Sequence, residues 1–293
     1  MALKVLVAGL YHLDSGKTVL ASSLVYALRR EGFKAVGFKP LGVTELWSYP
    51  RILEESVRAG ALVTRDGLAL YKATGAFNPI VLNPVGGIAV PLDPRVFEWR
   101  ESLMDAALSN PYSRMALARV TFCTMEAPAS RHFFNQAACA RTARSVREEV
   151  EEAAILLRPM PEHTTPRGLA ELFENEGGAA ADSCLDAVSE KAEVVVAESN
   201  SDIAAPTRRL ASPDLVVLVA RNVAALVNGL RYSKAVELRM RQGKPWTVST
   251  REIASLLAPQ RVVELPLKSD PSEGYSASEI EEIVEEVKSL ARR

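Results

Sequence analysis

The sequence contains few of the residues that build metal clusters. Its 293 residues include three cysteines and three histidines, all far apart in the chain. Cysteine and histidine ligands of structural zinc sites normally recur at short, regular spacings. We therefore expect no zinc site in this protein.

Net charge and long apolar runs are also lacking. The chain has 35 basic and 36 acidic residues, so its formal net charge is -1. Such a balance creates no overall field that would attract nucleic acid or an anionic membrane. No apolar stretch is long enough to span a bilayer, and the apolar N-terminal stretch is not followed by a small-residue cleavage site. We expect a cytoplasmic protein with no nucleic-acid or membrane partner.

Apolar segments of strand length alternate with segments of helical periodicity over much of the chain. The hydrophobic content of 48% is enough for one large core. The alternation predicts an α/β fold in which helices cover both faces of a mainly parallel central sheet, giving three layers. The expected strands are 4–8, 33–38, 194–198, 215–220 and 261–267, and the expected helices are 17–31, 226–241 and 278–291.

The middle of the chain has a different pattern. Between residues 98 and 182 the one strand signal is 115–122, whereas apolar residues at helical spacing over 136–158 predict an amphipathic helix. We predict a single domain over 1–293 with a largely helical insertion at about 98–182. The apolar stripe of this helix needs a partner surface, either as a wall of the substrate site or as a contact between two copies in a homodimer.

The segment GLYHLDSGKT, residues 9–18, lies between the first expected strand and the first expected helix. A strand, loop and helix in this order direct several backbone N–H groups and a helix N-terminus at one point, which suits an anion. In a phosphate loop the lysine of Gly-Lys-Thr reaches the β- and γ-phosphates and the threonine hydroxyl holds Mg²⁺. Tyr11 stands where the usual spacing has the first glycine, and a chance tripeptide at a helix start is the alternative. We predict an ATP or GTP site formed by Gly9, Asp14, Ser15, Gly16, Lys17, Thr18 and Val19.

Five segments, in the right order, resemble the dethiobiotin synthetase family. They are GLYHLDSGKT with the following helix and strand to FKP at 40, DGLALYKATGAFNPIVLNP at 66–84, AEVVVAESNSDIAAP at 192–206, PDLVVLVA with VNG at 213–229, and APQRVVELPL at 258–267. The resemblance covers about two-thirds of the chain and leaves out the insertion. It implies the fold of a P-loop NTPase and an ATP-dependent ligase that activates a small-molecule carboxylate or carbamate by phosphoryl transfer.

The resemblance also implies roles for particular side chains. Lys17 and Lys39 would be catalytic, with Lys39 contacting both the transferred phosphate and the anion that attacks it. Thr18, Asp66 and Glu198 would hold Mg²⁺, which takes hydroxyl and carboxylate oxygens as ligands. Each assignment has a simpler alternative, because Glu198 could be a solvated strand end, Asp66 a helix cap and Lys39 a lysine that faces water.

Two departures from the family pattern bear on the substrate. The loop before Gly16 is one residue longer, and the glycine-rich segment after the acidic strand end has become Ser199-Asn200-Ser201-Asp202. We therefore expect a divergent enzyme with another substrate. The alternative function is a MinD-like regulatory ATPase, a nucleotide-dependent switch that acts with a partner protein. That group has a second lysine early in the loop, and His12 occupies its position here, although a histidine is not a reliable cation.

Overall fold

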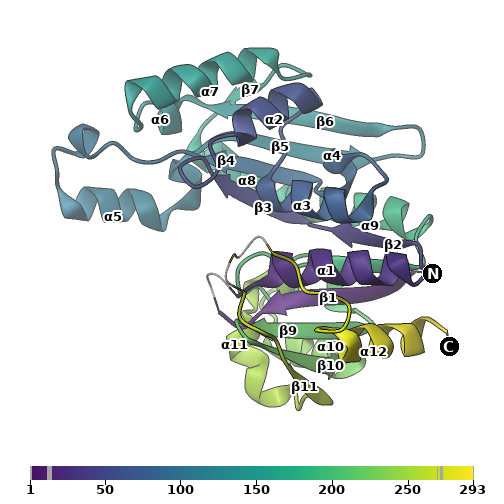
Figure 1. Cartoon of the computed structure of the whole chain (residues 1–293). Helices are drawn as coiled ribbons and strands as arrows, with labels where there is room; N and C mark the ends of the chain where they lie inside the picture. Colours follow the sequence, from purple (N-terminus) through teal and green to yellow (C-terminus); the bar gives the residue numbers. More distant parts are fainter. Residues whose placement is uncertain (1, 12–14, 269, 271–272, 293) are drawn as a thin grey trace. The chain divides into compact units, whose positions relative to one another are not determined.

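The computed structural model describes residues 2–11, 15–268, 270 and 273–292 and shows an α/β protein with two mixed sheets (Figure 1). The chain forms two compact units. Unit 1 consists of Met1–Pro40, Ala69–Asn78 and Asp182–Arg293, and unit 2 consists of Leu41–Leu68 and Pro79–Ala181. Lys17, Lys39 and Glu198 therefore belong to unit 1, and Asp66 belongs to unit 2.

The sheet of unit 1 has the strand order β11-β10-β9-β1-β8-β2. Strands β9, β1, β8 and β2 are parallel to one another, whereas β10 is antiparallel to both of its neighbours. The prediction of a mainly parallel sheet is thus confirmed for four strands, and β10 makes the sheet mixed. The bounds are β1 Leu3–Gly9, β2 Ala35–Phe38, β8 Val194–Glu198, β9 Leu215–Ala220, β10 Val223–Asn228 and β11 Arg261–Glu264.

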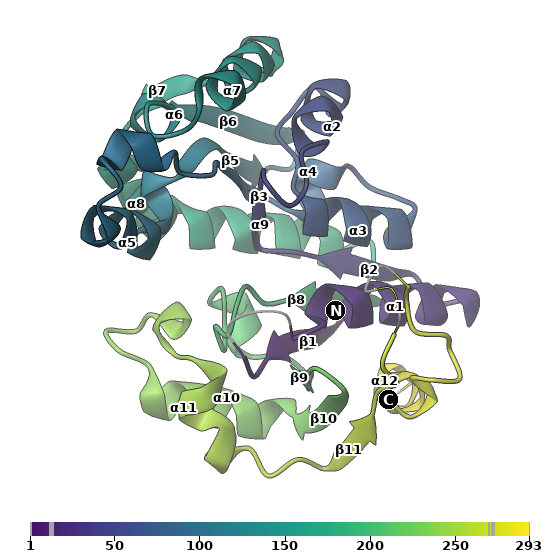
Figure 2. The same cartoon turned by 60° about the vertical axis from the view of Figure 1, so that its left-hand side comes forward.

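Helices cover both faces of this sheet. Helices α1 and α12 lie on one face, and α10 lies on the other (Figure 2). Leu20, Leu24 and Leu28 of α1 share one buried core with Val5 and Val7 of β1, as their helical spacing requires. The bounds of these elements are α1 Lys17–Arg30, α10 Gly229–Arg239, α11 Thr250–Ile253 and α12 Glu281–Ala291.

Helix α1 ends where the sequence predicts. Gly32 has a φ of 92°, and the N–H groups of Gly32 and Phe33 donate to the carbonyls of Arg29 and Leu28. These two hydrogen bonds form a Schellman motif, in which glycine is favoured because the left-handed conformation costs it little. The motif turns the chain directly into β2, which ends next to Lys39.

The sheet of unit 2 has the strand order β3-β4-β5-β6-β7, with β4, β5 and β6 antiparallel and an outer strand parallel to its neighbour at each edge. Its strands are β3 Leu41–Glu45, β4 Val85–Ala89, β5 Met115–Cys123, β6 Pro128–Asn135 and β7 Glu162–Thr164. Its helices are α2 Ile52–Ala59, α4 Pro79–Leu82, α5 Glu101–Ser109, α6 Gln136–Cys139, α7 Arg144–Leu156 and α8 Pro166–Leu172, while α3 Arg65–Thr74 and α9 Gly178–Ser189 cross from one unit into the other.

The predicted insertion at 98–182 contains the strands β5, β6 and β7 as well as the helices α5, α6, α7 and α8. The strand signal at 115–122 corresponds to β5, whereas β6 and β7 were not predicted. The compact unit to which most of this segment belongs already begins at Leu41. A polar residue helps to explain why β6 was missed, because His132 is buried where alternation would require an apolar side chain.

The amphipathic helix predicted at 136–158 is two helices, α6 and α7. The apolar face of α7 is covered by its own unit, because Val150 and Ala153 pack in one core with Ile52 and Leu53 of α2 (Figure 1). The stripe therefore needs no second copy of the chain to cover it. The apolar stripe therefore no longer supports a homodimer, which stays a prediction.

Arg119 and His132 are directly opposed across β5 and β6. The Arg119 guanidinium is fully buried and donates to main-chain carbonyls, including that of Leu62 at 2.7 Å. The Nε2 atom of His132 accepts the N–H of Leu62 at 3.1 Å, and its Nδ1 lies 2.9 Å from the carbonyl of Pro159. These partners fit a neutral imidazole with its proton on Nδ1. Burial, with the charge of Arg119, lowers the pKa of His132 to about 4.

This arrangement predicts a pH dependence of stability. Because the unfolded histidine has a pKa near 6.5, His132 is protonated in the unfolded chain but neutral in the folded chain between about pH 6.5 and pH 4. Stability is therefore lost as the pH falls through this window, by up to about 3 kcal/mol from this residue. In urea unfolding at pH 7.5 and pH 4.5, we expect His132→Gln to show a smaller drop than the wild type. The exposed His163 gives a control, and an equal drop in H132Q and H163Q would contradict the prediction.

Candidate functional site

The strands of unit 1 bring three sequence-predicted segments to one edge of the sheet. Strands β1, β8 and β2 are adjacent and parallel, so their carboxyl ends lie side by side. The register pairs Val7 with Glu198 and Phe38 with Ala197, which places Lys39 next to Glu198. Ligand sites of open α/β sheets lie at such carboxyl edges.

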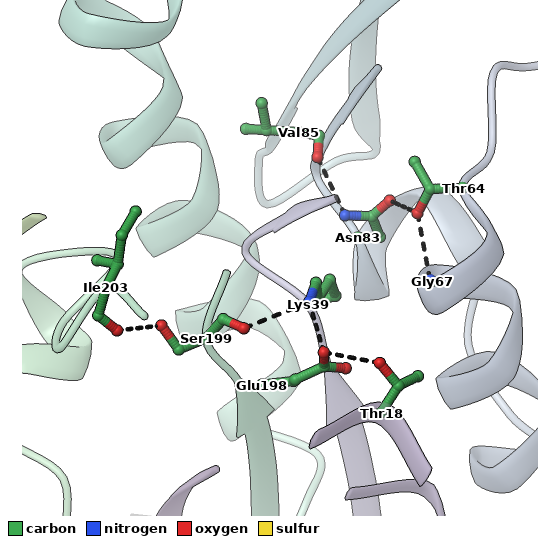
Figure 3. A network of polar contacts seen from close by, with 9 residues as sticks. All are labelled: Thr18, Lys39, Thr64, Gly67, Asn83, Val85, Glu198, Ser199 and Ile203. Atoms are coloured by element: carbon green, nitrogen blue, oxygen red, sulfur yellow. Dashed lines mark hydrogen bonds and ion pairs between the residues drawn. The ribbon is translucent and has the colours of Figure 1, made fainter. Parts of the chain in front are cut away.

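One carboxylate oxygen lies at the centre of this edge (Figure 3). The Oε1 atom of Glu198 accepts a hydrogen bond from the Thr18 hydroxyl at 2.8 Å and one from the Lys39 ammonium at 2.6 Å. Lys39 also donates to the carbonyl of Ser199 at 3.3 Å. The structure thus brings together three of the side chains that the sequence selects.

Burial excludes two of the simpler alternatives. Glu198 is 1% exposed and Lys39 is 2% exposed, so neither is a solvated surface charge. Removing two opposite charges from water costs several kcal/mol for each ion, and their attraction offsets this only with good geometry and further hydrogen bonds. The contacts to Thr18 and to the Ser199 carbonyl supply such hydrogen bonds. A buried pair of this kind is weak evidence for stability alone, which directs attention to a chemical role.

The described part of the predicted phosphate loop has the backbone that an anion site needs. Gly16 is the N-cap of α1 and has a φ of 82°, a left-handed conformation that favours glycine. The first turn, which begins Lys17-Thr18, contains no acidic residue that would neutralise the helix N-terminus. The Ser15 side chain is buried and donates to the carbonyl of Tyr11 at 3.0 Å. Lys17 is nine-tenths buried, so its ammonium is held at the loop.

Gly9 fixes the position of the Lys17 side chain. A methyl group at Gly9 would lie 2.7 Å from the Nζ of Lys17 and 2.8 Å from the Oγ of Ser15. A β-carbon there would therefore push the flexible lysine aside without a clash against the main chain. Gly9 is required for the ammonium to reach its place beside the loop.

For the nucleotide site that the sequence predicts, we expect Gly9→Ala to weaken the binding of ATP with Mg²⁺ by at least about tenfold, which corresponds to about 1.4 kcal/mol. The fold should survive, because the displaced atoms belong to side chains. Isothermal titration calorimetry measures the affinity, and circular dichroism checks the fold. Gly177→Ala is a suitable control, because a methyl group there meets its nearest neighbour at 3.9 Å. Unchanged affinity in a folded G9A protein would contradict the role given to Gly9.

Two other residues that the sequence singles out, Asp14 and His12, lie outside the described residues. Asp66 belongs to unit 2, where it is half-buried in the first turn of α3. That place agrees with the alternative reading of Asp66 as a residue of a helix start, and unit 1 by itself does not supply it to Thr18. Val19 follows Thr18 in α1 and is half-buried.

The sequence analysis did not select a basic residue that lies beside the predicted phosphate loop. Arg221 follows β9, whose end pairs with Gly9, and its guanidinium lies 5.9 Å from the centre of the Tyr11 ring. Arg221 begins a two-residue turn to β10 with a φ of 49°, where glycine or asparagine is usual. The sequence does not reveal that a non-glycine residue such as Arg221 has a positive φ. Its one usable signal was a basic residue directly after an apolar strand.

The sequence analysis also missed Thr250, which connects the segment after Glu198 to the end of β1 by hydrogen bonds. Thr250 donates its hydroxyl proton to the carbonyl of Gly9, and its N–H donates to the carbonyl of Asp202 at 2.8 Å. The side chain of Asp202 forms an ion pair with Arg251 at 3.3 Å. The segment that replaces the expected glycine-rich loop is therefore held in place through the start of α11. Residues more than forty positions apart make these contacts, so no local pattern predicts them.

Thr18 and Glu198 have the donor chemistry that Mg²⁺ prefers. Both offer hard oxygen atoms, and the two atoms are 2.8 Å apart at the N-terminus of α1. Mg²⁺ usually takes only one or two protein oxygens and keeps several waters when it binds with a nucleotide. In the described part of the chain, no group of three or more acidic, histidine or cysteine side chains could hold a metal ion. A site at Thr18 and Glu198 would therefore depend on water and phosphate for its remaining ligands.

No protein-family model matches the sequence, and no curated protein matches it. Among the described residues, no helix combines the length and apolar character that crossing a membrane requires. The geometry of the edge is therefore the basis for inferring a function.

Proposed function

We propose that this protein is a Mg²⁺-dependent P-loop NTPase, similar to dethiobiotin synthetase, that uses ATP or GTP to activate a small-molecule carboxylate or carbamate. The observation that carries the proposal is the shared Oε1 atom of Glu198, which contacts the Thr18 hydroxyl and the Lys39 ammonium beside the loop. A hydroxyl, a carboxylate and two buried lysines at the N-terminus of a helix fit a nucleotide triphosphate and an anionic second substrate better than a purely structural role.

Each side chain has a task in this proposal. The α1 N-terminus and Lys17 bind the nucleotide phosphates, and Thr18 with Glu198 holds Mg²⁺, which supplies charge neutralisation at the phosphates when bound. The carboxylate oxygen of the second substrate forms a bond to the γ-phosphorus while the bond from that phosphorus to the β–γ bridging oxygen breaks. The electron pair leaves with the nucleoside diphosphate. Lys39 reduces the repulsion between the two anions.

The test is steady-state release of phosphate from ATP and from GTP, with and without a panel of small carboxylates and carbamates. The proposal predicts slow turnover alone and a marked stimulation by at least one compound of the panel. Turnover that responds to no compound but rises with a protein partner would favour the MinD-like switch. A protein that hydrolyses neither nucleotide under any of these conditions would contradict both functions.

A further inference from the structure

The carboxylate of Glu198 has two tasks that oppose each other. The proposed function requires this carboxylate for the metal ion, beside the Thr18 hydroxyl that its Oε1 atom contacts. The same Oε1 atom contacts the Lys39 ammonium at 2.6 Å. A divalent cation and an ammonium on one carboxylate would lie within a few ångströms of each other. In surroundings as buried as these, that proximity is strongly unfavourable.

We infer that Lys39 is an internal counter-ion that competes with the divalent cation for Glu198, so that the cation displaces Lys39 from Oε1. The inference rests on the proposed function for the identity of the cation site. It accounts for an ion pair buried to 2% and 1% exposure at a place where a hydrophobic pair would cost less. Without the metal, Lys39 holds the Oε1 atom of Glu198, which also contacts Thr18.

Displacement also gives Lys39 its next contact. Once the cation neutralises Glu198, the ammonium loses the contact at 2.6 Å, while the carbonyl of Ser199 remains within 3.3 Å. A buried ammonium that loses an anionic partner favours the binding of an anion that enters the edge. Metal binding thereby makes Lys39 available to the transferred phosphate or to the anion that attacks it. By reciprocity, any anion that draws Lys39 away from Glu198 strengthens metal binding by the same factor.

The probe is Mn²⁺ alone, without nucleotide, and its free concentration can be measured by electron paramagnetic resonance. At pH 8, Lys39→Met should bind Mn²⁺ at least about tenfold more tightly than the wild type. The control is Lys34→Met, which removes one positive charge from an exposed residue just before β2 and should bind Mn²⁺ as the wild type does. Adding Glu198→Gln to K39M should abolish the gain. Equal Mn²⁺ affinity in K39M and K34M would overturn the inference.

A second measurement covers the case in which K39M is too unstable to purify. Lys39→Gln keeps a side-chain donor but no charge, and Mn²⁺ should raise its thermal midpoint more than that of the wild type or of Lys39→Arg. An equal Mn²⁺ effect on K39Q and K39R would also overturn the inference. The proposed function and the competition at Glu198 can be contradicted separately. If K39M gains Mn²⁺ affinity but the wild type binds no nucleotide, the proposed function falls and the competition stands. If the wild type binds nucleotide but K39M has no higher Mn²⁺ affinity, the competition is wrong and the proposed function stands.

Discussion

Lys39→Ala is expected to reduce substrate-stimulated turnover by about 10²-fold or more without weakening nucleotide binding. Loss of one preorganised electrostatic contact in a transition state typically costs this much. Lys39 lies beside Glu198 at the end of β2, so it can serve the reacting anions without being required to hold the nucleotide. The measurements are phosphate release at saturating activator and the affinity for nucleotide by calorimetry.

Two controls keep this result interpretable. Removing one partner of a buried ion pair can destabilise a protein by several kcal/mol, so the thermal midpoint of K39A must be measured alongside its activity. Lys34→Ala, at an exposed lysine five residues earlier, should retain full turnover. A folded K39A protein with wild-type stimulated turnover would show that the carboxylate-activating mechanism is wrong. The switch function would then be preferred, because it needs only a positioned water, the metal and the loop.

Lys17→Ala should weaken the binding of ATP or GTP with Mg²⁺ by about 10²-fold, which is about 2.7 kcal/mol. The ammonium of Lys17 is held beside Gly9 by burial, and it forms charge-assisted contacts with phosphate oxygens in the proposed complex. Calorimetric titration of K17A against the wild type measures the loss, and K34A again serves as the matched control. Affinity within a factor of two of the wild type would remove Lys17 from the site.

Some of this fold could be predicted because local sequence decides it. Strand β9 is an uninterrupted apolar run, and β8 is apolar up to its last residue, Glu198, as strands buried on both faces require. Strand β10 was hidden because Val223–Asn228 joins directly to α10 and contains residues that suit a helix equally well. Strand β5 matches the strand signal at 115–122, whereas β6 was hidden in part by His132, whose burial depends on the N–H group that the distant Leu62 donates to its ring.

The site divides in the same way. Lys39 and Glu198 could be placed together from the sequence, because each follows a predicted parallel strand and such strands end at one edge. Their direct ion pair could not be predicted, since it depends on the register of β2 and β8. The tie from Thr250 to Gly9 joins residues at opposite ends of the chain. It has no local signal at all.

The most direct test of the central proposal is a calorimetric titration of the wild-type protein with ATP, and separately with GTP, in the presence of Mg²⁺ and again with excess EDTA. The proposal predicts saturable binding of one nucleotide per chain for at least one of the two, and a clear loss of affinity without the metal. Absence of saturable binding of either nucleotide at millimolar concentration, by a folded protein with Mg²⁺ present, would contradict it.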